Sequence, residues 1–138
     1  MKTNKCIVMD GKSIKKNILE ELKEEVSLLE VKPKLVVIQV GNDDASNVYI
    51  KQKKKMAEYI GYEYEHIKLE STITTEEILN IIDGLNNDKR VNGIMVQMPL
   101  PKGIDTDKIQ NAVIPEKDVD GLSDMNAGLL FHNKDALF

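Results

Sequence analysis

A lysine on the apolar side of a predicted helix is the first residue of this sequence whose position suggests chemistry. Residues 45–60 (ASNVYIKQKKKMAEYI) are typical of a helix, and at about 100° per residue Lys53 shares a side with Tyr49 and the apolar positions. An unpaired ammonium group that turns inward is costly or loses its proton, and such lysines can act as acid/base groups. The structural alternative is a stem along the core edge with its head in water. The other lysines of this helix form a solvated surface on the opposite side: Lys51, Lys54 and Lys55.

A glutamine inside an apolar stretch is the second candidate. Gln97 lies in residues 93–98 (GIMVQM), which are typical of a buried strand, and a buried amide needs hydrogen-bond partners. The Lys53 ammonium is one candidate partner, and neighbouring backbone is the alternative. Pro99 and Pro101 end this strand, because proline cannot continue a central ladder.

Two aspartates near the end of the chain form a third candidate group. In residues 117–121 (KDVDG), Asp118 and Asp120 share a side if the segment is extended. Asp-Gly is also a favoured turn dipeptide, and the spacing alone favours the turn. Residues 126–128 (NAG) can likewise be interpreted as a turn.

The elements that position these residues begin with a helix and a strand. Asp10 can cap a helix that ends before Pro33. Its apolar residues keep near-helical spacing: Ile14, Ile18, Leu22, Val26 and Leu29. Residues 35–40 (LVVIQV) follow as a nearly continuous apolar run, the pattern of a strand covered on both faces in a parallel sheet.

A second strand and a third helix complete the alternation. Residues 62–69 predict a strand with poor alternation, because three polar residues share a face: Tyr64, His66 and Lys68. Thr74 and Glu77 form a capping box before a helix that reaches Leu85.

The order αβαβαβ predicts the α/β class, a three-layer αβα sandwich with a mostly parallel sheet and right-handed crossovers. Ligands bind beyond the carboxyl ends of such strands. Here those ends carry residues 41–44 (GNDD) and 97–101 (QMPLP), and the Lys53 helix starts at the same edge.

Composition excludes several classes of function. A chain of 138 residues with 41% hydrophobic and 30% charged residues favours a single domain, and a net charge of −4 with pI near 5.2 argues against a nucleic-acid partner. Cys6 alone cannot form an internal disulfide, and no signal peptide or membrane-spanning run is visible. His66 and His132 offer no metal-binding spacing and are expected at the surface. A cytoplasmic protein with no metal and no membrane partner is predicted.

Four segments, in this order and spacing, carry a resemblance: VGNDDASNVYIKQKKK, GIMVQMPLP, PEKDVDG and NAGLL. From about Ile7 onward the chain closely resembles the N-terminal half of the bifunctional methylenetetrahydrofolate dehydrogenase/methenyltetrahydrofolate cyclohydrolase family. The resemblance implies that Lys53 is the catalytic lysine and that Gln97 orients it. It also implies that Tyr49 packs on the aminobenzoyl ring of the folate and that Asp120 binds the pterin. Three further residues are expected in the substrate site: Ser46, Pro99 and Leu100. Asp44 stands where many members have proline, a change in loop stiffness.

The resemblance further implies oxidation of 5,10-methylenetetrahydrofolate with NAD(P), then hydrolysis to 10-formyltetrahydrofolate, by a homodimeric full-length enzyme. Family members are about twice as long, and their second, Rossmann-type domain binds NAD(P). No G-x-G pair occurs among the eight glycines here, so residues 1–138 are expected to be the tetrahydrofolate-binding catalytic domain without the cofactor domain. A folate-binding module without activity is one alternative. A shikimate or amino-acid dehydrogenase-like domain is another, although VQMPLP and KDVDG argue against it.

Overall fold

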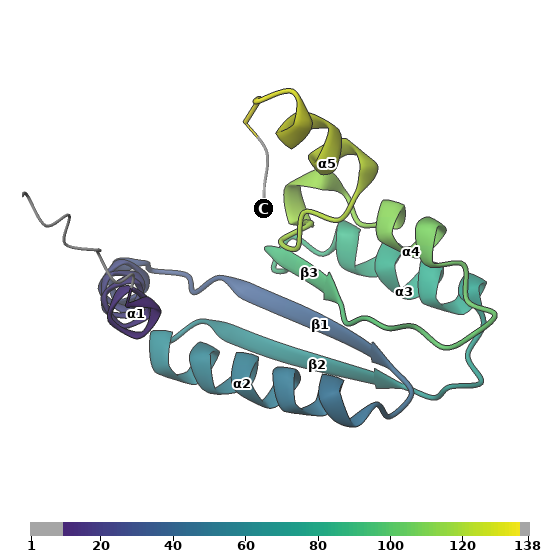
Figure 1. Ribbon diagram of the computed structural model, residues 1–138, viewed down its shortest axis with the longest axis horizontal. Coiled ribbons are helices and arrows are strands. Elements are labelled where there is room, and N and C mark those ends of the chain that lie inside the picture. Colours follow the sequence, from purple (N-terminus) through teal and green to yellow (C-terminus); the bar gives the residue numbers. More distant parts are fainter. Residues whose placement is uncertain (1–9, 136–138) are drawn as a thin grey trace, which may run out of the picture.

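Three parallel strands form the centre of the molecule, in the order β2-β1-β3, with helices on both faces (Figure 1). The computed structural model describes residues 10–135, so Cys6 and the final residues 136–138 lie outside the described part. The elements are α1 (Gly11–Leu28), β1 (Lys34–Val40), α2 (Asp44–Ile60), β2 (Glu63–Leu69), α3 (Thr75–Asn87), β3 (Gly93–Val96), α4 (Thr106–Ala112), the 3-10 turn η1 (Pro115–Lys117) and α5 (Asp124–Phe131). The predicted α/β class and parallel sheet are confirmed.

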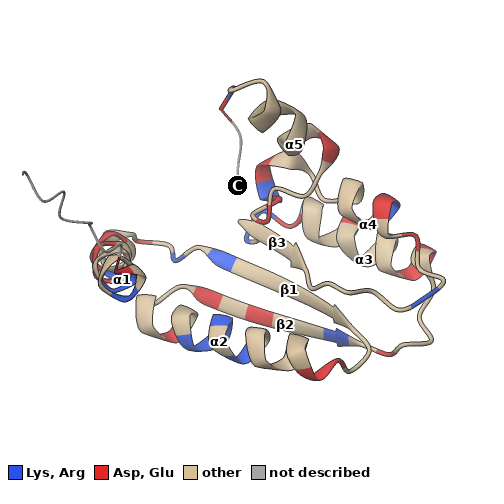
Figure 2. Ribbon diagram, in the orientation of Figure 1, with Lys and Arg blue, Asp and Glu red and all other residues tan. Residues whose placement is uncertain are grey.

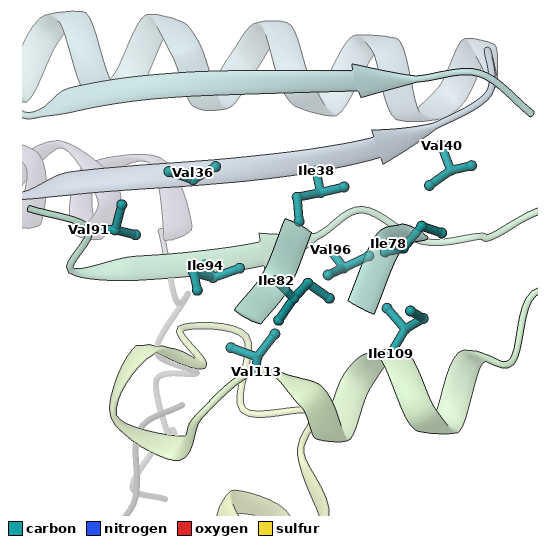
Figure 3. Close-up of a cluster of buried hydrophobic side chains, with 10 residues drawn as sticks. All are labelled: Val36, Ile38, Val40, Ile78, Ile82, Val91, Ile94, Val96, Ile109 and Val113. Carbon is teal, nitrogen blue, oxygen red and sulfur yellow. The ribbon is translucent and has the colours of Figure 1, made fainter. Parts of the chain in front are cut away.

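The central strand β1 is covered on both faces, as its apolar run predicts. Val36, Ile38 and Val40 belong to a buried cluster with residues of α3, β3 and α4, and Figure 3 shows the side chains that meet there. The alternate residues Val37 and Gln39 are also buried, on the face that α2 covers. Each fully buried aliphatic side chain contributes about 1.5–3 kcal/mol to folding.

Helix α2 begins and ends at strong capping residues. The Asp43 side chain accepts a hydrogen bond from the Ser46 backbone N–H at 2.7 Å, and Gly61 ends the helix in the left-handed conformation at φ 97°. Ile50 and Ala57 are buried against the sheet, and Lys53 is half-buried beside them. The predicted inward position of this lysine is therefore confirmed.

Helix α1 forms as its apolar spacing predicts, but most of its apolar side chains are not buried. The Asp10 cap is confirmed, since its carboxylate accepts from the Lys12 backbone N–H at 3.1 Å, and the helix ends one residue before Leu29. Only Val26 is buried, because α1 packs beside α2 rather than on the sheet. The other apolar residues of the stripe are largely exposed: Ile14 53%, Ile18 49%, Leu22 39% and Leu29 47%.

The segment after β3 contains the other differences. The strand ends at Val96 rather than Met98. The Gln97 N–H still donates to the Ile38 carbonyl at 2.8 Å, but the next donor on that side would be residue 99, a proline that follows a cis peptide bond and has no N–H. Residues 126–128, interpreted as a turn, lie within α5. A helix forms there because Ser123 caps it, accepting from the Asn126 N–H at 3.3 Å.

Among residues 10–135, no helix is long and apolar enough to cross a membrane. Both histidines are exposed, as expected.

Candidate functional site

Lys53 lies between a glutamine and an aromatic ring. Its Nζ donates a hydrogen bond to Gln97 Oε1 at 3.3 Å and lies 5.7 Å from the centroid of the Tyr49 ring. Both distances are compatible with attraction, one as a hydrogen bond and one as a cation–π contact. The Lys53 nitrogen is therefore held in place by two neutral partners.

Gln97 has both kinds of partner that its sequence position suggested. Its Oε1 accepts from Lys53, and its Nε2 donates to the Met98 backbone carbonyl at 2.9 Å. Because both ends of the amide are engaged, its orientation is determined and the lysine nitrogen is held in one direction. The hydrogen bond joins the middle of α2 to the carboxyl end of β3.

Ser46 connects the same two segments. Its Oγ donates to the Met98 carbonyl at 3.2 Å, and only 3% of the residue is exposed. Pro99 is exposed at the same edge, while Leu100 is half-buried and packs against the core cluster. The structure thus gives Ser46 a role in joining α2 to the 97–101 segment, and its contact with a substrate stays a prediction.

Tyr49 is the exposed wall of this site. It projects from α2 one turn before Lys53, and 58% of its surface is exposed. A flat aromatic face of this kind can stack on a planar ligand, an interaction worth about 0.5–1.5 kcal/mol beyond burial of area.

Asp120 is a carboxylate that interacts electrostatically with Lys53. Partial burial of its carboxyl group raises its pKa above the usual value of 3.8, the Lys53 ammonium opposes this shift, and the charge of Asp118 adds to it. The residue itself remains exposed, within the turn that the Asp-Gly pair predicts: the Gly121 N–H donates to the Asp118 carbonyl at 3.2 Å. The structure therefore brings Asp120 within electrostatic range of the lysine.

The segment that carries Asp118 and Asp120 forms a turn, so the extended alternative is wrong. Asp118 is buried, pairs with Ile94 at the edge of β3, and accepts hydrogen bonds from Ser123 N at 2.9 Å and Asn126 Nδ2 at 3.1 Å. Burial alone would raise the pKa of Asp118, but these hydrogen bonds bring it below the usual value. Asp118 holds the segment that carries Asp120. Sequence reasoning missed this network, although a serine followed by an aspartate is a typical helix start and could have revealed it.

Chemically, the site combines an oriented amine, an aromatic platform and a carboxylate that recognises donors. Such a set suits proton transfer at a planar, nitrogen-containing ligand. Within residues 10–135, no group of three or more His, Cys, Asp or Glu side chains could hold a metal ion.

Comparison with known proteins gives consistent matches. The family model for the tetrahydrofolate dehydrogenase/cyclohydrolase catalytic domain matches residues 9–120. The chain is 46% identical over 129 residues to the bifunctional protein FolD of Ligilactobacillus salivarius, covering 91% of this chain and 45% of that protein. It is 50% identical over 127 residues to FolD of Staphylococcus aureus, covering 90% and 44%. The chain thus spans about half the length of these relatives.

Solved structures agree. The bifunctional FolD enzyme of Campylobacter jejuni superimposes with a TM-score of 0.90 at 40% identity, over 94% of this chain and 47% of that one. The Trypanosoma brucei enzyme, solved with NADP and an inhibitor, has a TM-score of 0.87 at 33% identity, over 95% and 46%.

Proposed function

The chain belongs to the tetrahydrofolate dehydrogenase/cyclohydrolase family, and from this membership we propose that it supplies the folate site and the catalytic lysine for one-carbon folate interconversion. The reactions are the NAD(P)-dependent oxidation of 5,10-methylenetetrahydrofolate to the methenyl form and the hydrolysis of that product to 10-formyltetrahydrofolate. The observation that carries the proposal is the hydrogen bond between Lys53 Nζ and Gln97 Oε1 at the ligand-binding edge of the sheet.

Lys53 handles the proton in the hydrolytic step. Water adds to the carbon of the methenyl cation, and the Lys53 amine takes the proton that the water loses. The C–N5 bond then breaks, N5 receives a proton, and the oxygen becomes the formyl carbonyl, so that one proton is released overall. The positive charge of the substrate favours the neutral amine, and Gln97 directs that amine toward the attacking water.

Tyr49 and Asp120 hold the substrate in position. The Tyr49 ring stacks on the aminobenzoyl group, and its exposure leaves that face free for the ligand. The Asp120 carboxylate, when ionised, accepts two hydrogen bonds from adjacent donors of the pterin. Ser46, Pro99 and Leu100 shape the edge beside them.

The residues present do not fit the phosphates of a dinucleotide. At the turn from β1 into α2, the Asp43 carboxylate accepts the Ser46 N–H, and Asp44 adds a second negative charge, so this helix terminus does not favour a phosphate. NAD(P) would accept the hydride in the oxidation step, and we assign its binding to the second half that longer relatives carry. From the family membership we also expect the full-length enzyme to be a cytoplasmic homodimer.

Titration calorimetry with a tetrahydrofolate analogue tests the folate site on residues 1–138. We expect saturable binding whose affinity falls at least about tenfold in Tyr49→Ala and in Asp120→Asn. A tenfold fall corresponds to a loss of about 1.4 kcal/mol of binding free energy in each variant. Tyr59→Ala is the matched control, because Tyr59 lies on the same helix but contacts Lys23 of α1. Binding of shikimate in place of the folate, or equal weakening in the control, would contradict the proposal.

A further inference from the structure

A cavity of about 430 Å³ lies on the flank of α2 that faces away from the candidate folate site. Lys51 and Lys54 reach it from α2, and Lys68 reaches it from β2. At 100° per residue, these two α2 lysines lie on the opposite flank from Tyr49 and Lys53. The cavity, here called the lysine pocket, is therefore separate from the candidate folate site.

The lysine pocket is strongly positive. No aspartate or glutamate lines it, and none of its three lysines forms a salt bridge within residues 10–135. Lys68 Nζ donates to a neutral acceptor, Asn42 Oδ1, at 2.7 Å. The neighbouring carboxylate Glu65 alternates to the other face of β2, where it pairs with Lys34 at 2.6 Å. Figure 2 shows lysines in the middle of α2 and at the carboxyl end of β2.

A buried amide orders the polar wall of this pocket. Gln39 is 2% exposed; its Nε2 donates to Asn47 Oδ1 at 3.0 Å, and its Oε1 lies 3.0 Å from His66 Nε2. Since the oxygen of this amide can only accept, His66 Nε2 carries the proton, and Nδ1 is left to gain a second one. A histidine held in this way becomes a further cation when an anion approaches.

Tyr64 supplies a hydroxyl group that lacks a partner. It lines the pocket, and its buried oxygen has no hydrogen-bond partner in the described part of the chain. Burial, followed by the nearby Tyr62, raises the pKa of Tyr64, so the phenol stays protonated and remains a donor. Leaving such a group unsatisfied costs about 1–3 kcal/mol. Because this oxygen is shielded from solvent, Tyr64 borders the pocket with its ring.

We propose that the lysine pocket binds a small organic molecule carrying a multivalent oxyanion. Three lysines and a histidine supply donors for the charged end, while Ile50 and the Tyr64 ring give an apolar wall for the rest. The volume lies within the usual range for small-molecule sites, about 300–1,000 Å³. The oxyanion can be a phosphate ester or a polycarboxylate, two sources with the same recognition chemistry.

Titration calorimetry on residues 1–138 with pyrophosphate in one arm and citrate in the other tests this proposal at physiological ionic strength. We expect one-to-one binding of at least one probe, and the tighter probe identifies the source. Lys54→Ala and Lys68→Ala should each weaken binding by about tenfold or more, since each removes a charge-assisted contact. Lys55→Ala removes the same charge from the same helix outside the pocket, and should change the affinity less than about twofold.

Proton NMR of the histidines gives an independent readout. Burial, followed by the charge of Lys68, lowers the pKa of His66 in the free protein, and a bound anion should raise it. The proposal is overturned if neither probe binds saturably up to about 10 mM, or if Lys55→Ala loses as much affinity as Lys54→Ala.

Discussion

Lys53 Nζ and Gln97 Oε1 come from positions 44 residues apart and lie 3.3 Å from each other. The first belongs to the middle of α2 and the second directly follows β3, so the fold of the sheet is needed to bring them together. A glutamine can hold a lysine without neutralising it, whereas a carboxylate would hold it as a permanent ion pair. The pair therefore fits an amine that must both lose and regain a proton.

The first prediction concerns Gln97 as a positioning residue. Gln97→Ala should lower the rate of methenyltetrahydrofolate hydrolysis by about tenfold or more, since small misplacements of a catalytic group can cost up to about 10²-fold. In a double-mutant cycle with Lys53→Met, the two effects should not add, because both act through one amine. Additive losses would show that Gln97 acts independently of the lysine.

The second prediction concerns Asp120 and pH. The folate site needs the ionised carboxylate, and the raised pKa of Asp120 means that affinity for a folate analogue is full above that pKa and falls as the pH drops through it. The decline should begin at a higher pH than an ordinary aspartate would give. Lys53→Met should move the midpoint further up, because the ammonium lowers the pKa of Asp120. Calorimetric titrations between about pH 4 and pH 8 measure this, and an unchanged midpoint in Lys53→Met would contradict it.

The third prediction concerns stability. Asp118→Asn should destabilise the fold by about 2 kcal/mol at neutral pH, since it weakens hydrogen bonds from Ser123 and Asn126 to a buried charge. The pKa of Asp118 is lowered in the folded state, so its contribution is complete above the unfolded pKa near 3.8 and is lost as the pH falls toward the folded value. Urea unfolding should therefore show the two proteins converging at low pH. Asp124→Asn, on the exposed first turn of α5, is the control.

The fourth prediction concerns the cofactor. Residues 1–138 alone should produce no NAD(P)H from methylenetetrahydrofolate, because Asp43 occupies the N-terminus of the helix that follows β1 and no G-x-G pair is present. An absorbance assay with NAD and with NADP checks this. Saturable reduction of either dinucleotide by the pure chain would refute the assignment of the cofactor to the other half.

Much of this architecture could be predicted from local patterns. The apolar run of β1, the Asp10 and Thr74 caps and the inward phase of Lys53 all depend on neighbours within a few residues. The pairing of Lys53 with Gln97 was one of two options for the glutamine, and the structure contains both, because the amide has two ends.

Other features depend on distant contacts. The buried position of Asp118 and the helix α5 were not predicted, because the hydrogen bonds from Ser123 and Asn126 to Asp118 join residues five and eight positions apart. The Asp-Gly pair indicates a turn at residues 120–121 but gives no sign that the carboxylate of Asp118 is buried. The exposure of α1 also could not be inferred, since helical periodicity predicts an apolar side without showing what covers it. The lysine pocket could not be predicted for a similar reason. The polar residues of β2 that line it look, in the sequence, only like a strand with poor alternation.

One substitution tests whether Lys53 is the catalytic base of folate hydrolysis. Lys53→Met keeps the volume and apolar contacts of the stem but removes the amine. The assay follows methenyltetrahydrofolate hydrolysis by a chimeric enzyme in which residues 1–138 are fused to the second half of a longer relative. Lys55→Met in the same chimera is the control for loss of charge. General acid/base groups contribute about 10²–10⁴-fold, so turnover should fall by at least about 10²-fold with the melting temperature unchanged. Hydrolysis at the wild-type rate in Lys53→Met would remove the lysine from the mechanism.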